Sequence, residues 1–236
     1  MRFLISLSVV ISFSHFANAF ACENPTLAIP RLSAPIQNGG PDPVKSAENL
    51  LTDFFEKRGQ KLTIKNGFPW ARMLAELENG NIDLIAPMLK TPERDEKYLF
   101  SDSWASDQHG VIVHKDSVFG FQSAEDLTHR NGAYLNGAAF PEPYRSYIQT
   151  HDNLTVVYDL DSLSKMLDQK RVDFILAPIG SLFRVIPEKM QDGRFVTLGP
   201  SVISTPLYIA FSRKSDCKNL IPALNAFIQE KSVPTN

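Results

Sequence analysis

The order of apolar segments constrains the fold of this chain more than any other feature. A short apolar segment at 26–29 precedes a segment at 47–55 in which apolar residues recur at helical spacing, and a second strand candidate follows at 62–64. Ser46 stands where a residue that caps the helix is expected. A strand, a helix and a strand in this order predict two parallel strands joined by a crossover helix. We therefore expect an α/β fold.

Two later segments, about ninety residues apart, repeat one pattern. The stretch 77–85 and the stretch 167–175 share their spacing, including the aspartates Asp83 and Asp173, and an amphipathic helix pattern precedes each. Both aspartates are interpreted as residues that cap a turn beside a buried strand. The repeat predicts two lobes of related construction.

The first nineteen residues have the features of a secretory signal peptide. Arg2 is followed by an apolar run at 3–13 and by the small-x-small sequence at 17–19. This run is too short to cross a bilayer, so residues 1–19 are predicted to be cleaved and the mature protein to be periplasmic. The chain has 24 Lys and Arg against 26 Asp and Glu, a formal charge of −2. Nothing in this balance indicates a nucleic-acid or anionic-membrane partner.

Two cysteines, Cys22 and Cys217, stand near opposite ends of the mature chain. In an oxidising compartment they are predicted to form one disulfide that joins the termini. Two alternatives stay open, namely a lipid-modified Cys22 and two free thiols.

A disulfide would bring the late strand candidate at 207–211 and the amphipathic helix at 220–228 back to the first lobe. The predicted division is therefore lobe 1 at 20–111 and 207–236, and lobe 2 at 112–206. The chain would cross between the lobes near 111–114 and near 201–207, which forms a double hinge.

The segment Thr91-Pro92-Glu93-Arg94 has the order of residues that begins a helix directly after a strand. Thr91 can cap the helix, proline suits its first position, and Arg94 then lies in the first turn. Ligands of open α/β sheets bind beyond the carboxyl ends of the strands. The guanidinium of Arg94 presents a rigid pair of donors that suits a carboxylate, although an arginine in a surface ion pair is the commoner case.

These motifs together resemble a known family. The order 77–83, Thr91 to Arg94 and Phe100-Ser101-Asp102 is similar to the signature of bacterial extracellular solute-binding proteins of family 3, the polar amino acid-binding type. The similarity continues through 126–127, 136–137 and 172–173 and covers nearly the whole mature chain. It implies the periplasmic binding protein type II fold, in which two lobes, each a mostly parallel sheet flanked by helices, are joined by a double hinge.

The resemblance also implies the positions that contact a ligand. Arg94 takes the place of the arginine that binds the ligand carboxylate, and Trp70 begins a helix that borders the site, where its indole can stack on a ligand. The other implied positions are Leu89, Gly137, Ala138, Ala139 and Pro178.

Several of these positions depart from the family pattern. Small hydroxyl residues near Leu89 are absent, and the glycine at the expected start of a lobe 2 helix is followed by Ala138 rather than by Ser or Thr. Pro178 stands where an aspartate would hold the ligand ammonium, and proline has no side-chain acceptor. We therefore expect a carboxylate-bearing solute that is not a standard amino acid.

The resulting hypothesis is a periplasmic, monomeric solute-binding protein without cofactor that serves the permease of an ABC transporter. A protein that signals to a membrane receptor is the first alternative. A dehydratase-type enzyme on the same fold is the second, but the implied ligand positions include no group for proton transfer at neutral pH. His109, His114, His129 and His151 lack metal-ligand spacing and are interpreted as surface or hinge residues.

Overall fold

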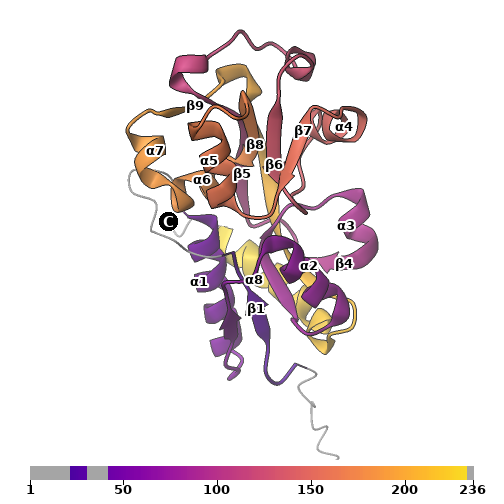
Figure 1. The fold of residues 1–236 in the computed structure, drawn as a ribbon. Helices are drawn as coiled ribbons and strands as arrows, with labels where there is room; N and C mark the ends of the chain where they lie inside the picture. Colours follow the sequence, from indigo (N-terminus) through magenta and orange to yellow (C-terminus); the bar gives the residue numbers. More distant parts are fainter. Residues whose placement is uncertain (1–21, 31–41, 233–236) are drawn as a thin grey trace, which may run out of the picture.

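Six strands of the described residues form two groups of three parallel strands, and each group is the centre of one lobe (Figure 1). The computed structural model describes residues 22–30 and 42–232, so the predicted signal peptide lies outside the described residues. The strands are β1 (Thr26–Ala28), β2 (Thr63–Lys65), β3 (Leu84–Met88), β4 (Tyr98–Phe100), β5 (Ala105–His114), β6 (Gly132–Leu135), β7 (Leu154–Val157), β8 (Phe174–Pro178), β9 (Phe195–Thr197) and β10 (Ile203–Ser212). Their order is β2-β1-β3-β10-β5-β8-β6-β7, with β4 paired to β10 and β9 to β5.

Helices cover both faces of each sheet (Figure 1). They are α1 (Pro43–Glu56), α2 (Trp70–Asn79), α3 (Pro92–Lys97), α4 (Tyr144–Thr150), α5 (Leu160–Asp168), α6 (Ile179–Val185), α7 (Pro187–Gln191) and α8 (Ile221–Ser232). Short 3-10 helices lie at Lys115–Ser117, Ala124–Leu127, Gly199–Ser201 and Asp216–Leu220. None of the helices in the described residues is long and apolar enough to cross a membrane.

The core of each lobe has two parts, one on either face of its sheet. In the first lobe, Leu84 and Ala86 of β3 pack with α1 and α8, while Ile85 between them packs with α2 on the other face. In the second lobe, Ile112 packs with α5 and α6, and Val111 packs with α4. This alternation is what a strand buried on both faces requires, and it agrees with the predicted α/β class.

Two long strands, β5 and β10, connect the lobes. Residues 203–207 of β10 pair with 105–109 of β5, whereas residues 208–212 pair with β3 and β4 of the first lobe. From His109 onward β5 pairs with β8 of the second lobe. The strand pairing therefore puts the first crossing between the lobes before Val111, ahead of the predicted segment 111–114. It puts the second crossing at the end of the predicted segment 201–207. The division at residues 111/112 and 206/207 itself stays a prediction.

The two aspartates of the sequence repeat make equivalent hydrogen bonds in the two lobes. The carboxylate of Asp83 before β3 accepts from the N–H of Thr26, at the start of the parallel neighbour β1 (2.8 Å). The carboxylate of Asp173 before β8 accepts from the N–H of Asn131, just before the parallel neighbour β6 (2.8 Å). Each aspartate thus ties the starts of two adjacent parallel strands together, a contact between strands in place of the predicted cap of a local turn.

The ends of the described chain meet in the core of the first lobe. A disulfide joins Cys22 to Cys217, and both half-cystines are buried, so the predicted pairing is present. The prediction that Ser46 caps the first helix is wrong. Helix α1 begins earlier, because the Asp42 side chain accepts from the N–H of Val44 and Pro43 occupies the first helical position.

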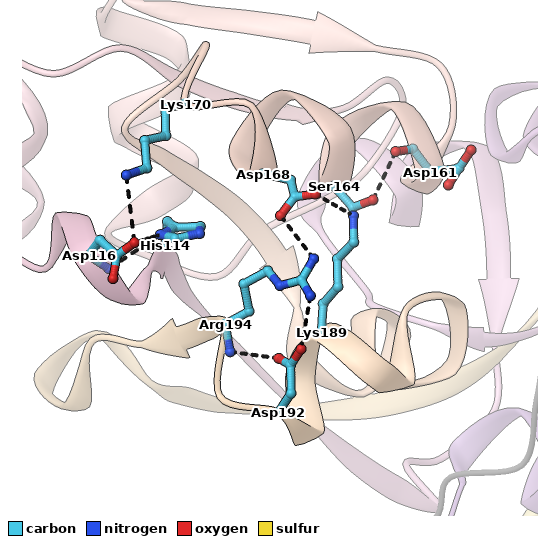
Figure 2. A network of polar contacts seen from close by, with 9 residues as sticks. All are labelled: His114, Asp116, Asp161, Ser164, Asp168, Lys170, Lys189, Asp192 and Arg194. Atoms are coloured by element: carbon cyan, nitrogen blue, oxygen red, sulfur yellow. Dashed lines mark hydrogen bonds and ion pairs between the residues drawn. The ribbon is translucent and has the colours of Figure 1, made fainter.

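Helix α5 of the second lobe is held at its carboxyl end by ion pairs. Asp168, in the last turn of α5, lies 3.1 Å from Lys189 of α7 and 3.5 Å from Arg194 before β9, and Arg194 also pairs with Asp192 (Figure 2). Within α5, the hydroxyl of Ser164 donates to the carbonyl of Asp161 (Figure 2). The ion pairs of Asp168 join α5 to α7 and to the start of β9, and the first turn of α5 lies at a cavity.

Candidate ligand-binding site

A cavity of about 470 Å³ lies between the two lobes. It is bordered by the carboxyl end of β3 in the first lobe and by the carboxyl ends of β6 and β8 in the second. Six of the seven predicted ligand positions line it: Trp70, Leu89, Arg94, Ala138, Ala139 and Pro178. The cavity therefore occupies the place that the carboxyl ends of parallel strands predict.

Arg94 is a buried cation at the edge of this cavity. Thr91 caps α3 by accepting from the N–H of Arg94, as the sequence predicts. Arg94 is only 8% exposed. Its Nη1 donates to the carbonyl of Leu89 at 2.8 Å, and no carboxylate among the described residues lies within ion-pair distance. Burial lowers the pKa of Arg94 to about 10, which leaves the guanidinium charged at neutral pH.

The carbonyl oxygen of Gly137 joins the two lobes. It accepts from Nη2 of Arg94 and from Nε1 of Trp70, both at 2.9 Å, and the guanidinium carbon of Arg94 lies 5.6 Å from the centre of the indole ring. Gly137 has φ of +74°, a conformation that glycine adopts without strain. Predicted positions from both lobes therefore meet at one main-chain oxygen.

The predicted helix start at Gly137 is wrong. After a turn at 136–137 the chain stays irregular, and α4 begins only at Tyr144. The N–H of Ala138 is used within the turn, where it donates to the carbonyl of Leu135. Gly137 therefore presents an acceptor to its neighbours, in place of the expected row of N–H donors.

Comparison with known proteins agrees with this geometry. The model of the bacterial extracellular solute-binding proteins, family 3, matches residues 47–232. The chain belongs to this family. No curated protein sequence matches it.

Solved structures similar to this family 3 protein include holo ArgBP from T. maritima, with a TM-score of 0.72, 18% identity, and coverage of 90% of this chain and 92% of that one. The arginine-, lysine-, histidine-binding protein ArtJ from Geobacillus stearothermophilus has a TM-score of 0.68 and 16% identity, over 88% and 89% of the two chains. A histidine kinase sensor domain with similarity to periplasmic binding proteins has a TM-score of 0.72 and 14% identity, over 89% and 91%. These likenesses confirm the periplasmic binding protein fold.

The wall of the cavity in this solute-binding protein also contains polar residues that the sequence reasoning missed. Asp107 and His109 of β5 line it, and so do Asp159 and Asp161 at the start of α5 and Ser181 of α6. The implied ligand positions themselves include no proton-transfer group, but these further residues of the wall do. The sequence did not place Asp107 and His109 at the cavity, because the segment 105–110 lacks an apolar strand pattern and becomes a strand only by pairing with β10.

His109 and His114 are buried rather than at the surface. His109 lies in β5 where the lobes are connected, in agreement with the predicted alternative of a hinge histidine. Nδ1 of His109 lies 3.0 Å from the hydroxyl of Thr205 on β10, and its ring packs edge-on against Phe140. Burial lowers the pKa of His109 to about 4, and the positive charge of Arg94 adds to this effect. His109 is thus neutral at physiological pH.

The lowered pKa of His109 predicts a loss of stability in mild acid. The imidazole of His109 takes up its proton near pH 6.5 in the unfolded chain but only near pH 4 in the folded protein. The contribution of this group to the free energy of unfolding is therefore fully present above pH 6.5 and is lost as the pH falls toward 4. We expect the free energy of unfolding to fall by about 2 kcal/mol from this group between pH 7 and pH 5. Urea unfolding at both pH values measures it.

Two variants separate this effect from other titrating groups. Asparagine does not titrate, so His109→Asn is expected to lack the change of about 2 kcal/mol. His129→Asn, at an exposed position, is expected to keep this change. The same acid dependence in His109→Asn and in the wild type would contradict the assignment.

Proposed function

We propose that this protein captures a small, carboxylate-bearing solute between its lobes in the periplasm and presents it to the permease of an ABC transporter. The observation that carries the proposal is Arg94, a buried cation at the cavity that donates, among the described residues, to carbonyl oxygens rather than to a carboxylate. A buried charge without a counter-charge is costly, and a solute carboxylate would supply that counter-charge.

The guanidinium retains donors for such a solute. It has five N–H groups, and the bonds to the carbonyls of Leu89 and Gly137 use one on each terminal nitrogen. The bond to Leu89 fixes the side chain within the first lobe, so the fork is already oriented when a carboxylate arrives. A solute that contacts Arg94 and the second lobe together would favour the closed arrangement of the lobes.

The remaining predicted positions have roles in this proposal. Trp70 provides an indole face for an apolar or delocalised part of the solute, while Ala138 and Ala139 form a small apolar wall in the second lobe. Pro178 supplies no acceptor for an ammonium group, which favours a solute other than a standard α-amino acid. We propose that the protein acts as a monomer and without a cofactor.

A thermal-shift screen tests the capture of a solute. The panel contains amino acids, hydroxy acids, dicarboxylates, neutral sugars and polyamines. A carboxylate at 100 times its Kd is expected to stabilise the fold by about 2.7 kcal/mol, which raises the Tm by roughly 5–10 °C in a chain of this size. Sugars and polyamines serve as the solutes without a carboxylate. No shift with any member of the panel would contradict the proposed function.

A receptor-signalling role is the second candidate, because one similar structure is a histidine kinase sensor domain. The two roles differ in the partner that recognises the closed form. Uptake of the identified solute by cells that lack the gene distinguishes them, since loss of uptake supports transport and unchanged uptake supports sensing. We propose that the protein performs no catalysis, and the solute is expected to be recovered unchanged after incubation.

A further inference from the structure

His109 lies at the junction of the lobes, beside the position where the sequence lacks an acceptor. In the antiparallel pairing of β5 with β8, His109 is the direct partner of Pro178, and in the pairing with β10 it is the partner of Ile203. The residue is only 3% exposed, yet it contributes to the wall of the cavity. A polar side chain therefore stands next to the proline on the same wall.

The hydrogen bonds around Thr205 determine which ring nitrogen of His109 carries the hydrogen. The hydroxyl of Thr205 donates to the main-chain carbonyl of Asp107 at 3.2 Å, and it lies 3.0 Å from Nδ1 of His109. A hydroxyl has one hydrogen, so both bonds can form together only if Nδ1 donates to the hydroxyl oxygen. In a neutral ring Nε2 then has a free lone pair and is an acceptor.

Nε2 makes no hydrogen bond within the described part of the chain, and it is not enclosed like the unpartnered buried atoms Nε of Arg58, Oε1 of Gln60 and Nε1 of Trp104. Because His109 lines the cavity, we take Nε2 to face it. An accessible acceptor on a buried side chain requires a donor from whatever fills the cavity.

We infer that Nε2 of His109 accepts a hydrogen bond from the solute and selects a carboxylate whose donor is an uncharged hydroxyl. This inference rests on the proposed function, because the carboxylate is bound by Arg94. The preference for an uncharged donor follows from the surroundings. At His109 itself, burial and the charge of Arg94 both disfavour a positive charge, and they act in the same sense on an ammonium group placed beside it. The carboxylates of Asp107, Asp159 and Asp161 also line the cavity, but burial and Arg94 are what shift the pKa of His109.

Matched acids test this selection. Each of three triplets has one side chain and one carboxylate and differs only at the α carbon: phenyllactate, phenylalanine and 3-phenylpropionate; 2-hydroxy-4-methylpentanoate, leucine and 4-methylpentanoate; 2-hydroxy-5-guanidinopentanoate, arginine and 5-guanidinopentanoate. Isothermal titration of the mature chain gives the Kd of each. In at least one triplet the hydroxy acid is expected to bind about tenfold more tightly than both companions.

Two variants show whether His109 is the cause. His109→Asn can place its amide near Thr205 but leaves no acceptor at the position of Nε2. The preference of about tenfold is therefore expected to disappear, while the acid without the hydroxyl keeps its affinity. His109→Gln can present an amide oxygen near the position of Nε2 and is expected to retain part of the preference. Melting temperatures of both variants check that they fold.

The outcomes separate this inference from the proposed function. If acids bind and raise the melting temperature but no triplet favours the hydroxy acid in the wild type, the inference about His109 is wrong and the capture of carboxylates stands. The inference is also wrong if His109→Asn keeps the full preference. If none of the nine acids binds and no solute of the thermal-shift panel has an effect, both proposals fail.

Discussion

Replacing Arg94 with glutamine is expected to weaken the binding of a carboxylate solute by about 100-fold or more. Among the described residues that line the cavity, Arg94 is the only arginine or lysine, and the variant removes its charge. Removing one charge of a buried, hydrogen-bonded ion pair lowers the binding free energy more than removing one charge of an exposed pair, because the remaining charge stays buried without a partner. Isothermal titration of the best acid from the solute panel measures the change. Arg94→Lys keeps the charge but not the planar fork, so an intermediate loss is expected.

The matched control is Arg171→Gln, which removes an exposed arginine of the second lobe that does not line the cavity. Its affinity for the same acid is expected to equal that of the wild type. Equal affinity of Arg94→Gln and Arg171→Gln would contradict the role of Arg94. The melting temperature of each free variant shows whether a loss of binding comes from a loss of fold.

Removing the disulfide is expected to lower the free energy of unfolding by about 3–5 kcal/mol. The bond joins residues 195 positions apart, so it restricts the unfolded chain over almost its whole mature length. Both cysteines are also buried in the core shared by α1 and α8, where serine would leave a hydroxyl to be hydrogen-bonded. Urea unfolding of the double variant Cys22→Ser/Cys217→Ser measures the difference.

Reductant supplies the control for the disulfide. Dithiothreitol is expected to destabilise the wild-type protein by a similar amount and to leave the double variant unchanged. A double variant within about 1 kcal/mol of the oxidised wild type would show that the bond contributes little to the fold.

The sequence predicted those parts of the fold that follow from local patterns. Helix α2 has its apolar stripe and a left-handed Gly80 at its end, and α3 begins at Thr91 with the expected cap. The beginning of α1 was missed because Asp42-Pro43 lies at the end of a loop segment, before any apolar residue at helical spacing. Local pattern therefore identified the elements and misplaced some of their ends.

The connection between the lobes could not be predicted in the same way. Only residues 111–113 and 207–211 have the apolar pattern of a strand, whereas the first halves of β5 and β10 are largely polar. These halves form strands because they pair with each other, an interaction between residues almost a hundred positions apart in the sequence. The first crossing was placed too late for this reason.

The residues of the candidate site also fall into those predicted from local pattern and those placed only by strand pairing. The predicted positions from Trp70 to Pro178 line the cavity because they follow strand ends that the family pattern marks. His109 had no such mark, and its contacts with Thr205 and Pro178 arise only from the pairing of three strands. Gly137 was predicted by position, but its carbonyl oxygen makes the contacts rather than its N–H.

A crystal structure of the complex with the best-binding acid tests most directly whether the protein captures a carboxylate between its lobes. We expect one solute molecule in the cavity bordered by Trp70 and Pro178, with its carboxylate oxygens about 3 Å from the terminal nitrogens of Arg94. A solute bound outside this cavity, or bound within it with its carboxylate away from Arg94, would contradict the account.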